Sequence, residues 1–350
     1  MPQYDLPEPA LARYRSAGDP PADLEAFWER TLGEARQARR STTLEPVETG
    51  LGLVSTFDVI FSGFGGGPVR AWYHRPAVAS ADLPIVVRYQ GYGDGRGVPH
   101  DVSFWVLAGY ACLEVDTRGQ GSGTGPRGPK HTTDPAGPQP TRAGHLTRGI
   151  LDPLTYHYRR VFTDAVLAVE AAADLPGVDG SRIGVGGVSQ GGGISLAVAA
   201  LATNVTAVMA DVPFLSDFRR GAEIADVPPY TELSAYLAAR PDHVFQAFET
   251  LAYFDVSILA LMARIPALFS VGLMDRVCPP STVYAAYNAY AGPKEIRSYP
   301  FNGHEGGHSF QQAEQLLWLS QLMPAPELVQ VSPSDRYPDR HERGADGHGR

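Results

Sequence analysis

The sequence predicts an α/β fold: a doubly wound, mostly parallel sheet with an N-terminal helix and hairpin extension and a helical cap insertion. From residue 83 onward, short apolar runs alternate with segments of helical periodicity. Strands with continuous apolar character are buried on both faces, as in parallel sheets. The 350 residues, 43% hydrophobic and 19% charged, have the composition of a globular protein. We expect a single domain over residues 1–325.

The N-terminal extension is predicted from two different periodicities. Apolar side chains in residues 21–40 recur at helical spacing, which predicts one helix. Residues 56–61 and 69–74 have strand character and flank the glycine-rich run SGFGGG. Two strand-like runs around a glycine cluster are typical of an antiparallel hairpin.

The alternating region supplies the remaining elements. Its expected strands are residues 85–89, 110–115, 183–188, 205–210, 267–271 and 296–299. Its expected helices include residues 161–174 and 192–202. Residues 213–263 interrupt the alternation with a mostly helical, aromatic-rich pattern, which favours a cap over the sheet edge; an ordinary long crossover is the alternative. The polar tail 326–350 has too few apolar residues to fold, and we expect disorder.

Charge and composition narrow the possible functions. The net charge is −9, whereas nucleic-acid-binding proteins usually carry a basic patch, so the charge argues against nucleic-acid binding. Residues 1–21 have neither the basic nor the apolar region of a secretory signal, and no apolar run approaches the roughly 18 residues of a membrane span. The two cysteines, Cys112 and Cys278, do not suggest a disulfide framework. We therefore expect a cytoplasmic protein.

The strongest chemical signal is the pentapeptide GVSQG at residues 187–191, which matches the nucleophile elbow G-x-S-x-G. The run before it resembles a strand, and the run after it begins a helix. Ser189 would stand on the strand-to-helix turn, where small neighbours are needed because the backbone is strained. A glycine-rich structural turn with a spectator serine is the alternative. We predict Ser189 as a nucleophile at the carboxyl edge of the sheet.

A serine nucleophile needs a base and a group that orients the base. In α/β hydrolases the acid and the histidine follow the serine in chain order. Asp275 follows an apolar run that ends in SVGLMD, and His304 follows a later predicted strand. Most other histidines precede the serine; His308 competes, but it stands at the start of the final predicted helix. We predict a triad of Ser189, Asp275 and His304 on an α/β-hydrolase fold.

Two N–H donors should stabilise the oxyanion in such a site. One belongs to Gln190, the residue after the nucleophile, at the start of a helix whose N-terminus carries partial positive charge. The other should come from the loop after an early strand, and Tyr92 in the run QGYG is the candidate. A plain glycine turn is the alternative for this run.

Residues 304–308, HEGGH, also fit the zinc motif H-E-x-x-H. The motif requires a helix, because only a helix places both histidines on one face. Gly306 and Gly307 each disfavour a helix by about 1 kcal/mol relative to alanine, and no third ligand is assigned. We expect no metal and no cofactor, and a zinc hydrolase is the less favoured alternative.

Other residues are expected to support the site without touching the substrate. Arg118 follows a predicted strand, where it could pair with Asp211 or Glu305 and hold the histidine loop. Cys278, close after the predicted acid, is interpreted as a small apolar neighbour of the pocket. Trp105 either lines the acyl pocket or belongs to the core.

Three ordered motifs resemble the signatures of carbohydrate esterase family 7, which comprises acetyl xylan esterases and cephalosporin C deacetylases. They are RGQ at residues 118–120, GVSQG at 187–191 and HE at 304–305. The resemblance extends from about the first helix to Leu322. It implies that Ser189, Asp275 and His304 form the triad and that Tyr92 and Gln190 donate to the oxyanion. Beside the resemblance, we expect supporting roles for Arg118, Gln120, Glu305 and Asp211.

The resemblance also implies a function. Family members are intracellular hexamers that deacetylate short acetylated oligosaccharides and cephalosporin C without a metal. We expect a carboxylic ester hydrolase that acts on acetylated xylo-oligosaccharides and similar small esters, with neither nucleic-acid nor membrane partners. A general short-chain esterase or peptidase on the same fold is the alternative, because fold does not determine substrate. A non-catalytic binding module is less favoured. The tail and the loop 126–148 depart from the family pattern.

Overall fold

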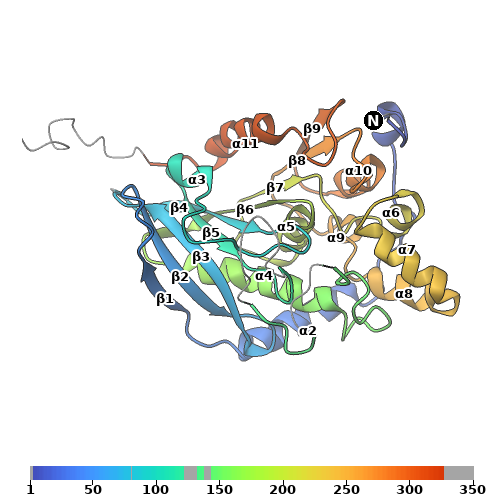
Figure 1. The fold of residues 1–350 in the computed structure, drawn as a ribbon, viewed down its shortest axis with the longest axis horizontal. Helices are drawn as coiled ribbons and strands as arrows, with labels where there is room; N and C mark the ends of the chain where they lie inside the picture. Colours follow the sequence, from blue (N-terminus) through green and yellow to red (C-terminus); the bar gives the residue numbers. More distant parts are fainter. Residues whose placement is uncertain (1–2, 80, 122–131, 138–142, 327–350) are drawn as a thin grey trace, which may run out of the picture.

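A computed structural model describes residues 3–79, 81–121, 132–137 and 143–326. The strands of these residues form one 9-stranded sheet in the order β1-β2-β3-β5-β4-β6-β7-β8-β9 (Figure 1). They are β1 Thr43–Val47, β2 Val54–Ser62, β3 Pro68–Pro76, β4 Leu83–Tyr89, β5 Ala111–Val115, β6 Val178–Val188, β7 Ala207–Asp211, β8 Ala267–Gly272 and β9 Lys294–Tyr299. The α-helices are α1 Glu8–Leu11, α2 Leu24–Gln37, α3 Phe104–Leu107, α4 His157–Ala173, α5 Gln190–Leu201, α6 Phe218–Ile224, α7 Tyr230–Ala239, α8 Val244–Leu251, α9 Val256–Leu259, α10 Pro280–Ala289 and α11 His308–Leu322.

Strand pairing confirms the predicted sheet. Strands β5, β4, β6, β7, β8 and β9 pair in parallel along the sheet. Helix α2 and the antiparallel hairpin β2–β3 form the predicted N-terminal extension. Strand β1, which pairs antiparallel with β2, was missed. Its segment TLEPV contains a proline, which edge strands tolerate because the missing N–H faces away from the sheet.

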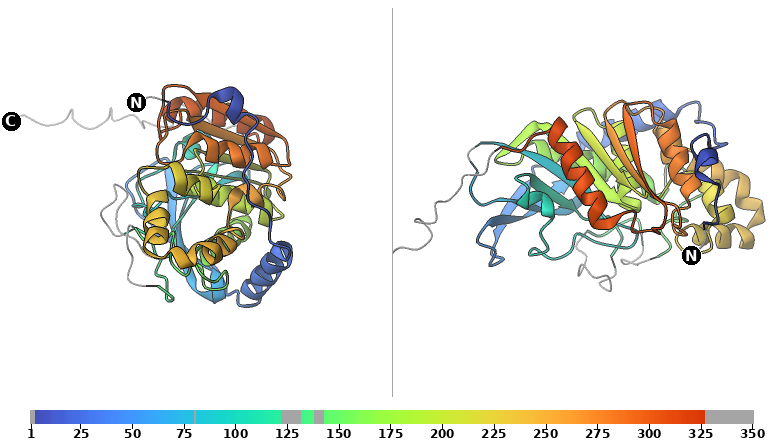
Figure 2. Two further views of the ribbon diagram at one scale, coloured as in Figure 1. Left: turned by 90° about the vertical axis from the view of Figure 1, so that its right-hand side faces the viewer. Right: turned by 90° about the horizontal axis from the view of Figure 1, so that it is seen from above.

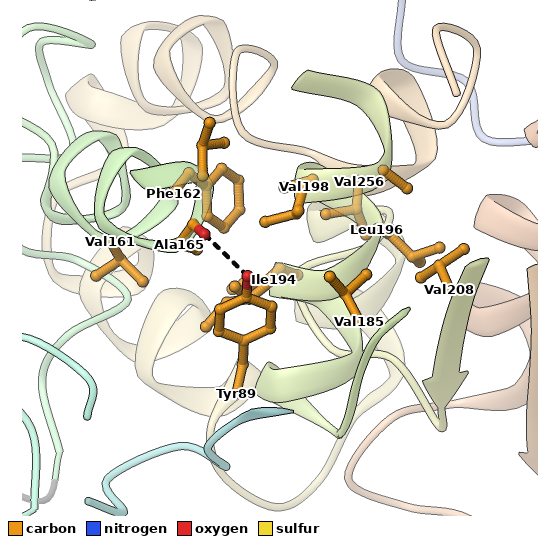
Figure 3. Close-up of a cluster of buried hydrophobic side chains, with 14 of the residues drawn as sticks. Tyr89, Val161, Phe162, Ala165, Val185, Ile194, Leu196, Val198, Val208 and Val256 are labelled. Atoms are coloured by element: carbon orange, nitrogen blue, oxygen red, sulfur yellow. Dashed lines mark hydrogen bonds between the residues drawn. The ribbon is translucent and has the colours of Figure 1, made fainter. Parts of the chain in front are cut away.

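Helices cover both faces of the parallel part of the sheet. Helices α4 and α5 pack on one face, and Figure 3 shows side chains of this core, with the Tyr89 hydroxyl donating to the Ala165 carbonyl at 2.8 Å. Helices α3 and α11 cover the other face, where Trp105 packs in a cluster with Tyr110 and Met323. Trp105 is therefore a core residue and not a wall of the acyl pocket.

The segment between β7 and β8 is helical, as predicted for residues 213–263, and contains α6, α7, α8 and α9. In the right-hand view of Figure 2, α6, α7 and α8 lie at the end of the molecule opposite the antiparallel strands. The two ends of the segment are tied together. The Asp255 carboxylate accepts the Asp217 amide at 2.9 Å, and the Val256 amide donates to the Leu215 carbonyl at 2.9 Å.

Two sequence predictions fall outside the described residues or only partly within them. Residues 327–350 of the predicted disordered tail lie outside them, as do parts of the loop 126–148. Within the described part of the chain, every helix is too short or too polar to cross a bilayer.

Candidate active site

Ser189 stands on the turn between β6 and α5, as the elbow motif predicts. Its φ and ψ are 60° and −118°, a conformation that non-glycine residues rarely adopt. Backbone bonds hold it there: the Ser189 amide donates to the Asp211 carbonyl at 2.9 Å, and the Ser189 carbonyl accepts from Gly193 and Phe214. The turn is thus fixed to strand β7 and to the first turn of α5.

Two glycines let this turn pack against strand β4. A Cβ on Gly191 would lie 2.2 Å from the Tyr89 carbonyl oxygen, and a Cβ on Gly187 would lie 2.6 Å from the Gly191 carbonyl carbon. Side-chain carbons do not approach backbone atoms so closely, and backbone cannot move aside cheaply. The G-x-S-x-G spacing is therefore a packing requirement of the turn.

The predicted acid and base meet in the loops after β8 and β9. Asp275 is fully buried, and its Oδ2 lies 2.8 Å from Nδ1 of His304. Its Oδ1 accepts the amides of Val277 and Cys278 at 2.8 and 3.0 Å. With the proton on Nδ1 held by this fixed carboxylate, Nε2 of His304 is available as a base. The His304 side chain is 31% exposed, so the ring is accessible to substrate.

Cys278 lies between the nucleophile turn and the acid–base pair. Its Sγ is 4.0 Å from the Ser189 Oγ and within 4.8 Å of ligand atoms of Asp275 and His304. Burial raises the pKa of the thiol well above its ordinary value, and the charge of Asp275 raises it further. The thiol is therefore neutral at physiological pH, which agrees with its interpretation as a small apolar neighbour. The spacing of these three side chains would suit a metal, but both Asp275 oxygens already accept hydrogen bonds.

A cavity of about 550 Å³ adjoins these residues. Ser189 and His304 line it from the sheet edge. The helical segment between β7 and β8 supplies another part of the wall through Pro228, Pro229 and Glu232. A larger cavity of about 870 Å³ lies among the N-terminal segment, α6 and α8 and contains no member of the predicted triad. The smaller cavity is therefore the candidate active site.

The two predicted oxyanion donors belong to connected loops. Gln190 is the first residue of α5, where backbone amides have no acceptor within the helix. Its side-chain amide donates to the carbonyl oxygens of Gln90 and Gly91, each at 3.2 Å. These bonds hold the loop that carries Tyr92 against the turn that carries Ser189.

Gln120 strengthens this connection. Its Nε2 donates to Oε1 of Gln190 at 2.9 Å, and its Oε1 accepts the Gly93 amide at 2.9 Å. The Tyr158 hydroxyl, on α4, also donates to Oε1 of Gln190 at 2.8 Å. Gln120 therefore joins the segments that follow β4, β5 and β6, which gives its predicted supporting role a structural basis.

Comparison with known proteins adds to this geometry. Residues 1–322 match the family described as acetyl xylan esterase (AXE1). The chain belongs to the acetyl xylan esterase family. It is 29% identical over 310 residues to the acetyl esterase Axe7A of Xylanibacter ruminicola. The aligned region covers 85% of this chain and 66% of that protein. The chain thus spans slightly less than two thirds of that relative's length.

Solved structures of acetyl xylan esterases have the same fold. The enzyme from Paenibacillus sp. R4 superposes with a TM-score of 0.83 at 35% identity, covering 91% of this chain and 100% of that one. Acetyl xylan esterase 1 from Thermoanaerobacterium sp. JW/SL YS485 superposes with a TM-score of 0.81 at 34% identity, covering 90% and 99%. Both matches support the α/β-hydrolase assignment.

Arg118 corrects the sequence analysis, because it pairs with neither Asp211 nor Glu305. Its guanidinium donates two hydrogen bonds to Asp164 on α4, at 2.7 and 2.9 Å. Strand order explains the difference: Arg118 follows β5, Asp211 ends β7, and strands β4 and β6 lie between them. Asp164 also accepts the Phe64 amide at 2.7 Å. In this member of the acetyl xylan esterase family, Arg118 therefore ties the segment after β5 to Asp164, the residue that also binds the hairpin loop.

Asp211 supports the site through the last helix. Its two carboxylate oxygens accept from Gln311 at 2.9 Å and from Gln315 at 2.7 Å, and both glutamines belong to α11. Burial raises the pKa of Asp211 to about 6, although the glutamine hydrogen bonds oppose the shift. Helix α11 follows the His304 loop directly, so Asp211 fixes the end of that loop to strand β7.

The HEGGH segment does not form the helix that a zinc motif needs. Gly306 and Gly307 have φ values of 50° and 89°, and α11 begins only at His308. Glu305 accepts the Gly303 amide at 3.1 Å and closes the turn. The predicted non-helical conformation of this segment is confirmed.

Two residues of the site had no signal in the sequence. Glu232, on α7, accepts the Tyr92 hydroxyl at 2.6 Å, and the Tyr4 hydroxyl donates to the Asp275 carbonyl at 2.8 Å. The partners are 140 and 271 residues apart, and neither contact belongs to a motif. Covariation between the paired positions is the kind of signal that could have found them.

Proposed function

We propose that this chain is a serine carboxylesterase that removes acetyl groups from acetylated xylo-oligosaccharides and similar small esters. The observation that carries the proposal is the convergence of the strained Ser189 turn and the hydrogen-bonded His304–Asp275 pair on one cavity. Membership in the acetyl xylan esterase family and similarity to an acetyl esterase support acetyl as the acyl group.

In the proposed reaction, Nε2 of His304 takes the Ser189 proton while Oγ attacks the acetyl carbon. The amides of Tyr92 and Gln190 donate to the oxygen that becomes negatively charged. The carbon–oxygen bond to the sugar then breaks, and the alcohol oxygen receives the proton from His304. Water next gives a proton to Nε2 of His304 while its oxygen attacks the acetyl carbon. The bond between that carbon and Oγ then breaks, Oγ takes the proton back from His304, and acetic acid leaves. The Asp275 carboxylate, bonded to Nδ1 of His304, stabilises the imidazolium in both steps.

A small acyl group fits the surroundings of the nucleophile. Cys278 lies 4.0 Å from the Ser189 Oγ, and the Tyr92 ring packs edge-on against Phe214 with 5.8 Å between centroids. Longer acyl chains would have to displace these packed groups, and overpacking typically costs about 1–3 kcal/mol. We therefore expect acetyl esters to be preferred over butyryl and longer esters by roughly 10- to 200-fold in kcat/KM.

The triad is tested with Ser189→Ala and His304→Ala on 4-nitrophenyl acetate and acetylated xylo-oligosaccharides. Each variant should lose roughly 10⁴- to 10⁶-fold in kcat, and the double variant little more, because the residues act as a unit. Turnover near wild type in Ser189→Ala would refute the proposed mechanism. Activity should also survive exhaustive chelation; a loss restored by zinc alone would favour the zinc alternative.

An additional substrate, the oligomeric state and the cellular location are further proposals, supported by the family resemblance. We propose cephalosporin C as an additional substrate, a homohexameric assembly and a cytoplasmic location. Acetate release from cephalosporin C, sedimentation velocity of the purified full chain and fractionation of the source cells test the three separately. A monomer at micromolar concentration would refute the hexamer without affecting the proposed chemistry.

A further inference from the structure

The Tyr92 hydroxyl is the meeting point of three chain segments. It donates to Oε2 of Glu232 at 2.6 Å and accepts the backbone amides of His145 and Leu146 at 2.8 and 3.1 Å. Burial raises the pKa of this phenol above its ordinary value, and the Glu232 carboxylate raises it further. The phenol is therefore protonated and remains a donor at any working pH.

Glu232 is well placed to accept this bond. It lies in the first turn of α7, where a negative side chain is favoured by the helix dipole. Its Oε2 also accepts the Gly144 amide at 3.0 Å. A hydrogen bond to an ionised carboxylate is roughly twice as strong as one between neutral groups.

The oxyanion loop is thus held from two sides. On one side, the Gln190 and Gln120 side chains bind the backbone of residues 90–93. On the other side, Glu232 binds the side chain of Tyr92 and belongs to the helical segment between β7 and β8. Without Glu232, the phenol keeps the amides of His145 and Leu146 but loses its acceptor, and with it the hydrogen bond that ties the loop to the helical segment.

We propose that Glu232 is a positioning residue that fixes the Tyr92 amide at the oxyanion through the Tyr92 hydroxyl. The inference rests on the proposed function, in which that amide donates to the developing oxyanion. Oxyanion donors act through their exact placement around the transition state, so a displaced loop lowers kcat more than it weakens ground-state binding. Glu232 itself touches no reacting atom.

The test compares Glu232→Ala with Glu232→Gln in the full-length chain, with 4-nitrophenyl acetate as substrate. Glu232→Ala should lower kcat about 10-fold, less than the roughly 100- to 1,000-fold lost when an oxyanion donor is removed outright. KM should stay within about twofold of wild type. Glu232→Gln keeps an oxygen that accepts the phenol, and it should restore most of kcat. Glu223→Ala, at an exposed position on neighbouring α6, is the matched control and should behave as wild type.

Tyr92→Phe examines the same bond from its other end and covers the case in which Glu232→Ala folds poorly. It removes the bond to Glu232 together with those from the His145 and Leu146 amides, so its loss of kcat should be at least as large as that of Glu232→Ala. The double variant should lose little more than Tyr92→Phe alone, because the bond to Glu232 is already absent there. Wild-type kcat in Tyr92→Phe, additive losses in the double variant, or an equal loss in Glu232→Gln and Glu232→Ala would overturn the inference. Ser189→Ala in the same assay distinguishes failure of the Glu232 proposal from failure of the proposed function. Full activity in Ser189→Ala refutes the proposed function itself.

Discussion

Replacing Asp211 with asparagine should change the pH dependence of stability in a defined direction. Asp211 ends strand β7 and is buried, and burial raises its pKa from 3.8 to about 6. Because the folded-state pKa lies above the unfolded value, the native state binds more protons between about pH 4 and pH 6. The contribution of Asp211 to stability is therefore fully present below pH 4 and is lost as the pH rises through 6.

The size of the effect follows from the shift. A shift of about two pKa units at about 1.4 kcal/mol per unit gives a loss of about 3 kcal/mol in unfolding free energy from pH 4 to pH 7. Asparagine is neutral throughout this range, so it makes no pH-dependent contribution to the unfolding free energy. We therefore compare the unfolding free energy of Asp211→Asn minus that of wild type at two pH values. This difference should be about 3 kcal/mol larger at pH 7 than at pH 4.

Urea unfolding of both proteins at pH 4, 5, 6 and 7 measures this difference. Subtracting wild type from variant removes the titration of other groups, including Asp255, whose pKa burial also raises to about 6. Asp255→Asn is a matched control, because it should show the same sign from a different place. A difference between Asp211→Asn and wild type that stays constant with pH would refute the assignment of a raised pKa to Asp211.

Three further predictions follow from packing and charge. Gly191→Ala places a methyl group against the Tyr89 carbonyl and should cost about 3 kcal/mol in urea unfolding, the upper end of the usual cost of overpacking; a near-wild-type midpoint would contradict the packing of the turn. Arg118→Ala leaves Asp164 buried without its cation and should cost about 3–5 kcal/mol, whereas a loss below about 1 kcal/mol would show that the pair is dispensable. Cys278→Gly enlarges the space beside the nucleophile and should raise kcat/KM for 4-nitrophenyl butyrate relative to the acetate; an unchanged ratio would mean that Cys278 does not limit acyl size.

The parallel strands were predictable because burial on both faces leaves a continuous apolar run, as in ALFSVG of β8. Strand β1 was not predictable for the opposite reason. It lies at the sheet edge with an exposed or half-buried pattern, so its pairing with β2 defines it and its apolar content does not.

The same distinction holds for the site. Ser189, Asp275 and His304 could be proposed because each follows a recognisable strand, and chain order in this fold assigns their roles. The partner of Arg118 could not be deduced, because it depends on the order of strands in the sheet. Glu232 could not be deduced either, because its contact with Tyr92 depends on how a helical segment folds back over the sheet edge.

The hydrogen-bonded base of the helical segment between β7 and β8 has a consequence for how such chains diversify. The bonds of Asp217 to Asp255 and of Leu215 to Val256 close the segment into a stem, while the nucleophile turn is held from Phe214, before the stem begins. Recombination at the stem would exchange residues 219–254 between relatives without moving the serine. A grafted helix that lacks an acceptor for the Tyr92 hydroxyl would give the cavity a new wall but would lower kcat. An exchange of this segment therefore changes substrate specificity and catalytic rate together, because Glu232 on α7 both lines the cavity and binds Tyr92.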